Sequence, residues 1–239
     1  MGSSEDWRDT ITALDGRYRC LAVDLPGHRD SVGLPPEDYS IEGTTRALIL
    51  LLDLLGIERP AVVGYSMGGR LALYFALHHP ERCAGLFLES AAPGIEDAVE
   101  RRARREADEE WARRLQEDFG TFLADWYRHP LFASLARHEG LVEAMIEARA
   151  RNDPGELARS LRGMGPGRGP SLWGELAGIR VPALAVAGDL DEKYVGIAHR
   201  MASISALVRV TVVPGAGHNV RAEVPRMYLG LLETFLLTS

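Results

Sequence analysis

Short apolar segments alternate with helix-forming segments in this chain of 239 residues, and this alternation restricts the folds that it can adopt. Three apolar runs, at 18–24, 61–64 and 84–88, are predicted to be buried strands. Predicted helices at 41–55 and 67–77 separate them. Strands that alternate with helices build parallel βαβ units, so the sequence predicts an α/β fold.

The alternation is interrupted at residues 94–175 by a long helical stretch that is rich in arginine, glutamate and alanine. We interpret this stretch as a helical lid inserted into a discontinuous core formed by residues 1–93 and 176–239. The second part of the core supplies two more predicted strands and a final helix, at 182–187, 208–213 and 222–237. A chain of this length fits one domain with an insertion.

The charge balance excludes one class of function. The chain carries 34 acidic and 27 basic residues, a net charge of -7, whereas non-specific nucleic-acid binding needs a basic surface. No apolar run approaches the ~20 residues that span a bilayer, and residues 1–7 show no signal-peptide pattern, so we expect a cytoplasmic protein without a membrane segment. The two cysteines have no metal-type spacing, and no metal site is expected.

A nucleophile pattern follows the second predicted strand. The segment Gly64-Tyr65-Ser66-Met67-Gly68 fits Gly-x-Ser-x-Gly and lies where a Val-rich strand turns into a helix. We expect a glycine on each side of the serine because a Cβ there would clash in so sharp a turn. The turn predicts that the Ser66 hydroxyl is exposed at the carboxyl edge of the sheet, where open α/β sheets place their sites.

A serine hydroxyl reacts at neutral pH only if a base removes its proton, so the interpretation requires a histidine and a carboxylate that orients it. Asp189 and Asp191 follow the strand at 182–187, and His218 follows the strand at 208–213. The order Ser, Asp, His matches the pattern of this nucleophile turn. We favour Asp191 over Asp189, and His218 over the six other histidines, which lie in or beside helices or in an early loop.

Arg70 is the only charged residue between Ala61 and Leu77, in a helix that is otherwise apolar on all sides. A buried arginine needs a partner. Either it forms a salt bridge with a neighbouring acid, or it faces the site and binds an anionic substrate. Many arginines of the 94–175 stretch have an acid four positions earlier, as Glu100 precedes Arg104, and are expected to form solvated pairs.

Several segments together identify a family resemblance. They are Gly64-Tyr65-Ser66-Met67-Gly68-Gly69-Arg70, Ala92-Pro93-Gly94-Ile95, Ala124-Asp125-Trp126-Tyr127, Pro130-Leu131-Phe132, Ser160-Leu161-Arg162-Gly163-Met164-Gly165 and Ala216-Gly217-His218-Asn219. Over essentially its whole length the chain resembles 2-succinyl-6-hydroxy-2,4-cyclohexadiene-1-carboxylate synthase, a family of menaquinone biosynthesis with an α/β-hydrolase fold.

The resemblance implies a lyase that eliminates pyruvate from 2-succinyl-5-enolpyruvyl-6-hydroxy-3-cyclohexene-1-carboxylate, a small tricarboxylate, without cofactor or metal. It implies that Ser66, Asp191 and His218 form a triad that acts as a base, with no acyl-enzyme. The residues that it assigns to substrate binding are Arg70, Arg104 and Arg149 for the carboxylates and Tyr65 and Trp126 for the pocket wall.

One departure concerns the N-terminal side. Members of the family have, upstream of the segment resembling Met1–Trp7, a strand that ends in His-Gly-Phe, and this sequence begins after that point. We therefore expect the N-terminal strands of the sheet to be missing and the natural chain to be longer. The Met67 N–H is expected to be one oxyanion-hole donor, while the other belongs to the missing strand.

Two other functions remain open from the residues. A carboxylesterase or carbon–carbon bond hydrolase on the same fold would use the same Ser66, Asp191 and His218. An inactive α/β-hydrolase that serves as a binding module is the alternative from a different class, although an intact Ser, Asp, His order argues against it. The sequence does not predict the oligomeric state.

Overall fold

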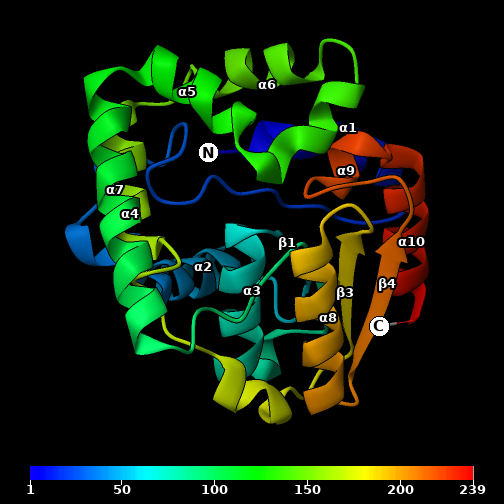
Figure 1. Ribbon diagram of the computed structural model, residues 1–239. Helices are drawn as coiled ribbons and strands as arrows, with labels where there is room; N and C mark the ends of the chain where they lie inside the picture. The colour runs from blue at the N-terminus through cyan, green and yellow to red at the C-terminus, as the bar shows by residue number, and fades with distance from the viewer. Residues whose placement is uncertain (239) are drawn as a thin grey trace.

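The computed structural model describes residues 1–238, which form a parallel sheet with helices on both faces (Figure 1). The sheet order is β1-β2-β3-β4. The strands are β1 (Ala61–Tyr65), β2 (Gly85–Glu89), β3 (Ala183–Gly188) and β4 (Val208–Val213). All neighbouring pairs are parallel, with Val63 opposite Phe87 and Phe87 opposite Leu184. This arrangement confirms the predicted α/β class.

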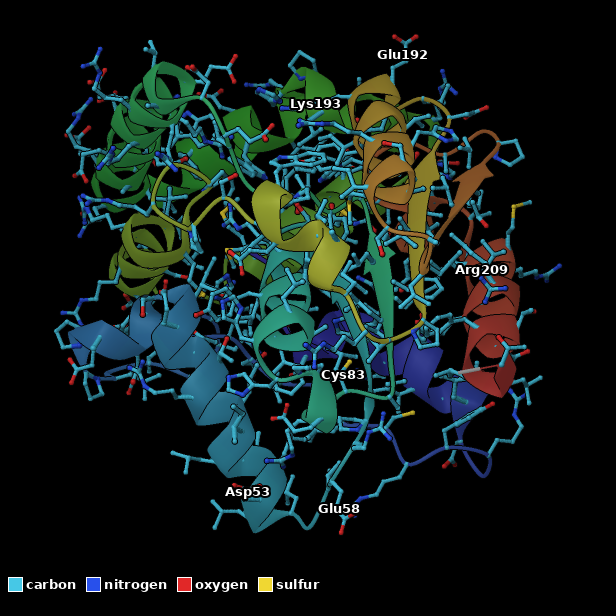
Figure 2. The ribbon with its side chains drawn as sticks, turned by 90° about the horizontal axis from the view of Figure 1, so that it is seen from below. Asp53, Glu58, Cys83, Glu192, Lys193 and Arg209 are labelled. Atoms are coloured by element: carbon cyan, nitrogen blue, oxygen red, sulfur yellow. The ribbon has the colours of Figure 1, made fainter. Side chains whose placement is uncertain are left out.

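Burial explains why the central strands are apolar throughout. Every residue of β2 and β3 is buried, because helices cover both faces of a parallel sheet. One face packs against α2 (Ile41–Leu54), α3 (Met67–His78) and α8 (Glu192–Ile204). On the opposite face, α1 (Arg8–Leu14) lies beside α10 (Pro225–Thr238), as Figure 2 also shows.

The rings of α10 fix that second layer. Phe87 of β2 meets Tyr228 and Phe235 in edge contacts, with ring centroids 5.4 and 5.8 Å apart. Such contacts stabilise a core beyond the area that they bury. A short helix, α9 (Val220–Glu223), precedes α10, so the single final helix predicted at 222–237 is in fact two helices. The break falls at Pro225, which cannot continue a preceding helix.

Helices of residues 94–175 lie over the carboxyl ends of the strands (Figure 1). They are α4 (Ala98–Glu117), α5 (Phe119–Arg128), α6 (Leu141–Arg149) and α7 (Pro154–Met164). The 3-10 turns of the chain are η1 (Ser4–Trp7), η2 (Pro36–Tyr39), η3 (Pro80–Arg82), η4 (Pro130–Arg137) and η5 (Trp173–Gly178). No helix within residues 1–238 is long and apolar enough to cross a membrane.

One predicted strand is wrong. Residues 18–24 are extended but belong to no strand, and Leu21 is 48% exposed. One cavity is lined both by this segment and by β1. The two segments are therefore separated by space and do not form a hydrogen-bonded ladder. A strand forms only where a neighbour satisfies its backbone groups, and this segment finds none in the described sheet.

Candidate active site

Ser66 occupies the turn between β1 and α3 in a strained backbone conformation, with φ 50° and ψ -110°. A non-glycine residue with positive φ is uncommon and persists only where the surroundings enforce it. Here the Ser66 N–H donates to the Glu89 carbonyl at 2.8 Å, which fastens the turn to the end of β2. The hydroxyl therefore projects from the carboxyl edge of the sheet.

The glycines around Ser66 do not all serve the same purpose. A Cβ on Gly64 would lie 2.5 Å from the Gly68 carbonyl oxygen, and one on Gly69 would lie 2.5 Å from the Ala91 Cβ. A Cβ on Gly68 would meet nothing within 4 Å. The prediction that glycine is required before the serine is confirmed at Gly64. After the serine, the position that leaves no room for a Cβ is Gly69 and not Gly68.

Gly69→Ala is expected to lower the free energy of unfolding by about 1–3 kcal/mol, because the new methyl group overpacks against Ala91. Gly68→Ala is the matched control and should leave stability unchanged or raise it by up to about 1 kcal/mol, since alanine favours a helix. Urea unfolding of both variants measures the difference. Equal stabilities would contradict the assigned packing.

His218 joins Ser66 and Asp191 through two hydrogen bonds. Its Nε2 lies 3.1 Å from the Ser66 Oγ, and its Nδ1 lies 2.7 Å from the Asp191 Oδ2. The imidazole is 1% exposed. Asp189 does not contact His218; its Oδ1 instead accepts a hydrogen bond from the Gly215 N–H at 2.8 Å. The structure therefore brings together the favoured carboxylate, the histidine and the serine in the geometry of a catalytic triad.

Three aromatic rings surround His218. Tyr65, Phe132 and Tyr194 have centroids 5.4, 5.9 and 4.6 Å from the imidazole. The family resemblance implies Tyr65 for the pocket wall, but it assigns no role to Tyr194. Its signal was available, because a tyrosine three residues after Asp191 falls in the first turn of α8 and faces the same way as the carboxylate.

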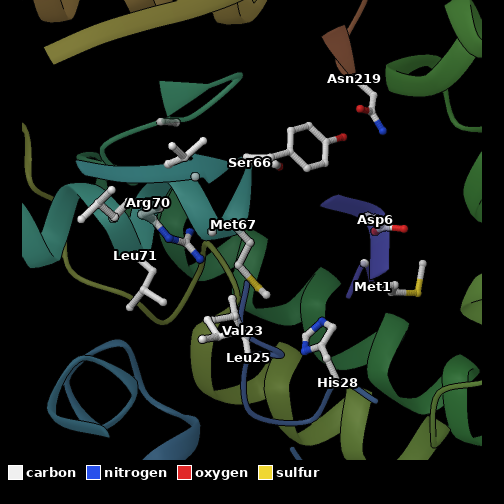
Figure 3. Close-up of a pocket in the computed structure, with 18 of the residues that line it drawn as sticks. Met1, Asp6, Val23, Leu25, His28, Ser66, Met67, Arg70, Leu71 and Asn219 are labelled. Atoms are coloured by element: carbon white, nitrogen blue, oxygen red, sulfur yellow. The ribbon is translucent and has the colours of Figure 1, made fainter. Parts of the chain in front are cut away.

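A cavity of about 1370 Å³ extends from Ser66 along β1 to the segment 18–24. Figure 3 shows Ser66, Met67 and Arg70 on one side of it, with Met1 and Asp6 on the opposite side. Met67 is the first residue of α3, so its N–H has no acceptor within the helix and is free for an oxyanion. The cavity is also lined by all the other residues predicted for substrate binding, which are Tyr65, Arg104, Trp126 and Arg149.

Arg70 is 4% exposed, yet no salt bridge joins it to a carboxylate in the described part of the chain. One guanidinium nitrogen donates to the Met164 carbonyl, and Nε has no hydrogen-bond partner among residues 1–238. Burial lowers the pKa of Arg70 to about 10. The salt bridge considered from the sequence is therefore absent among residues 1–238. The charge of Asp108 favours the charged form of Arg70, and the guanidinium lines the cavity.

The other two predicted arginines have partners. Arg104 Nε donates to Asp108 at 2.6 Å rather than pairing with Glu100, and its guanidinium lies 5.0 Å from the Trp111 ring centroid. Arg149 donates two hydrogen bonds of 2.7 Å to Asp6, from Nη1 to Oδ1 and from Nη2 to Oδ2. Although burial alone would raise the pKa of Asp6, the Arg149 charge and hydrogen bonds keep it below its usual range.

Glu89 is a fully buried carboxylate next to the nucleophile. Its Oε1 accepts the Arg221 N–H at 2.9 Å, while its carbonyl accepts the Ser66 N–H. Burial raises the pKa of Glu89 to about 7, against the opposing charge of Arg221. The folded protein therefore binds this proton more tightly than the unfolded chain, and stability falls as the pH rises through the folded pKa.

As the pH rises from about 4.5 to about 7, the raised pKa of Glu89 is expected to lower the free energy of unfolding by up to about 3 kcal/mol. Glu89→Gln, which stays neutral, should flatten that slope and be more stable than the parent at about pH 8. Glu147→Gln, at a side chain that is 79% exposed, is the control and should keep the parent slope. Urea unfolding across the pH range measures all three, and identical slopes would contradict the assignment.

Within residues 1–238, no group of three histidine, cysteine, aspartate or glutamate side chains is arranged to hold a metal ion. The polar groups that line the cavity include a serine with its base, several guanidinium groups and the carboxylates of Asp6, Glu96, Asp97 and Glu100. The serine, its base and the guanidinium groups suit proton transfer next to a polyanion.

Comparison with known proteins identifies the family of this chain. Residues 1–223 match the family model of the alpha/beta hydrolase fold. A protein of Bacillus subtilis (strain 168) described as a putative 2-succinyl-6-hydroxy-2,4-cyclohexadiene-1-carboxylate synthase is 36% identical, over 98% of this chain and 86% of its own length. The chain belongs to this synthase family. The predicted α/β-hydrolase fold and the family resemblance are thereby confirmed.

Two further relatives support the assignment to the synthase family. The 2-succinyl-6-hydroxy-2,4-cyclohexadiene-1-carboxylate synthase of Serratia proteamaculans (strain 568) is 35% identical, over 99% of this chain and 90% of that protein. The solved structure of MenH from S. aureus superposes with a TM-score of 0.94 at 31% identity, covering 99% of this chain and 90% of that one. Synthase-family similarity thus extends along the whole described fold.

Proposed function

We propose that this protein is a lyase of menaquinone biosynthesis that eliminates pyruvate from 2-succinyl-5-enolpyruvyl-6-hydroxy-3-cyclohexene-1-carboxylate. The observation that carries the proposal is Arg70, a buried cation in the cavity that Ser66 faces, with no salt bridge to a carboxylate of residues 1–238. A neutral ester gives no reason for such a cation, whereas a substrate carboxylate supplies a hydrogen-bonded anionic partner. The synthase relatives are named for the product of this reaction.

In the proposed reaction, the Ser66 Oγ removes a ring proton and passes its own proton to His218 Nε2, 3.1 Å away. The electrons of the C–H bond at C2 form the C2–C3 double bond, and the existing ring double bond shifts from C3–C4 to C4–C5. The C–O bond to the enolpyruvyl group at C5 breaks, and its electrons leave with the pyruvate enolate, which takes up a proton to become pyruvate. Asp191 stabilises the imidazolium through its 2.7 Å hydrogen bond.

The cavity offers cations for a tricarboxylate. Arg70 binds one carboxylate directly, and Arg104 and Arg149 lie along the same cavity. Because Arg149 already has Asp6 as a partner, a substrate carboxylate must share or replace that contact. The Met67 N–H stabilises negative charge that develops near Ser66. The proposal needs no cofactor, and it assigns a small tricarboxylate as the partner and the cytoplasm as the location.

The main alternative is an esterase or carbon–carbon bond hydrolase, in which Ser66 forms a covalent acyl intermediate. Intact-protein mass spectrometry during turnover separates the two reactions. The lyase proposal expects pyruvate to accumulate while the protein mass stays unchanged. An added acyl mass that disappears in Ser66→Ala would contradict it. A folded protein that binds the substrate but turns over neither it nor an ester would support the binding-module alternative.

A further inference from the structure

Glu223 is a buried carboxylate for which the proposed reaction has no use. It is the last residue of α9, the short helix that begins directly after His218-Asn219, and its side chain is 0% exposed. In the described residues no arginine or lysine forms a salt bridge with it, and the nearest base is His138, whose Nε2 is 4.0 Å from Oε2. A buried charge of this kind needs hydrogen bonds to offset its lost hydration.

The hydrogen bonds of Glu223 go to the two residues that flank His218. Oε2 accepts the Gly217 N–H at 3.0 Å, and Oε1 accepts the Asn219 N–H at 3.3 Å. The second contact resembles a capping box, because Asn219 is the N-cap of α9. Helix capping does not explain the first contact, which reaches past the helix to the residue before the catalytic base.

The turn η4 packs against the same loop close to Glu223. A Cβ on Gly217 would lie 2.0 Å from the Ser134 Oγ of η4, so this turn is packed tightly against the loop. Phe132, also in η4, presents its ring to the His218 imidazole. Glu223 and η4 therefore both pack against the His218 loop.

We propose that Glu223 is a positioning residue for His218. By accepting an N–H on each side of His218, the carboxylate fixes the loop so that the imidazole meets both Ser66 and Asp191. This inference rests on the proposed role of His218 as the base. A carboxylate suits the task because it has two acceptor oxygens, whereas a glutamine has one and would direct an NH₂ group at the other N–H.

Glu223→Gln tests the proposal with little change in side-chain volume. We expect kcat for pyruvate release to fall by about tenfold to a hundredfold while KM stays within about twofold, since a small displacement of the base is costly. We also expect the low-field proton resonance of His218 Nδ1–H to shift or broaden. A kcat and a resonance equal to those of the parent would overturn the proposal.

Glu156→Gln is the matched control. Glu156 also connects the lid to the core, but the residues to which it hydrogen-bonds are not in the His218 loop. Its Oε2 accepts the Gly33 N–H at 3.2 Å and the Tyr39 hydroxyl. We expect this variant to lose stability but to keep kcat within about twofold. A kcat loss as large as that of Glu223→Gln would show a general effect of loosening the lid and would overturn the specific role of Glu223.

Hydrogen exchange in the unsubstituted protein tests the proposal without requiring that a variant folds. The amides of Gly217 and Asn219 should exchange slowly although Gly217 lies outside any helix or strand, and exchange at the rate of an open loop would overturn the proposal. His218→Ala, assayed in parallel, separates the two hypotheses. If His218→Ala is active, the proposed base is wrong; if it is inactive while Glu223→Gln matches the parent, only the positioning role is wrong.

Discussion

Replacing His218 with alanine is expected to slow pyruvate release by about a hundredfold to ten-thousandfold, the usual contribution of a positioned acid–base group. The reason is geometric: without the imidazole, 3.1 Å from Ser66, nothing near the hydroxyl accepts its proton. Steady-state assay of pyruvate measures the loss. Since the imidazole is buried, thermal unfolding must show that the variant is folded.

His199→Ala is the matched control for this prediction. His199 lies on α8, is exposed and has no place in the site, so its removal should leave turnover within about twofold of the parent. A folded His218→Ala variant that retains half or more of the parent activity would exclude the triad as the base.

Arg70→Met is expected to raise KM by about tenfold to a hundredfold, because a charge-assisted contact with a substrate carboxylate contributes about 1.5–3 kcal/mol. The expected change in stability has the opposite sign from that of an ordinary core substitution. Arg70 is buried and forms no salt bridge with a carboxylate of residues 1–238, so a methionine of similar length should leave the ligand-free protein at least as stable as the parent. Substrate kinetics and thermal unfolding measure the two effects.

Arg105→Met, one residue from the predicted ligand Arg104 but exposed, is the control and should change neither quantity. If Arg70→Met unfolds more easily and binds substrate as well as the parent does, then Arg70 is a structural residue. That outcome would remove the observation on which the choice of a polyanionic substrate depends.

The parts of the fold that follow from local sequence were predicted well. The Val-rich run of β1, the nucleophile turn and the apolar helix α3 are adjacent in the chain, and the order of Asp191 and His218 follows from the strands before them. The segment at 18–24 was predicted wrongly because its apolar pattern suits a strand, whereas forming one depends on a neighbouring strand that no local pattern supplies.

The partners of the charged residues were much less predictable. Arg149 meets Asp6 across 143 residues of sequence, and Glu89 meets the backbone of Arg221 across 132. Such contacts arise only when the strand edges and the helices of residues 94–175 are assembled. Even within α4, spacing alone left Arg104 with two acids at the same distance along the helix, and the structure pairs it with Asp108 rather than Glu100.

The most direct test of the proposed lyase is a proton NMR time course of the purified protein with the enolpyruvyl substrate. Elimination by the Ser66 and His218 pair predicts that pyruvate and the cyclohexadiene product appear together, in equal amounts, as the substrate disappears. Unchanged substrate, or products of carbon–carbon bond hydrolysis without the cyclohexadiene, would contradict it.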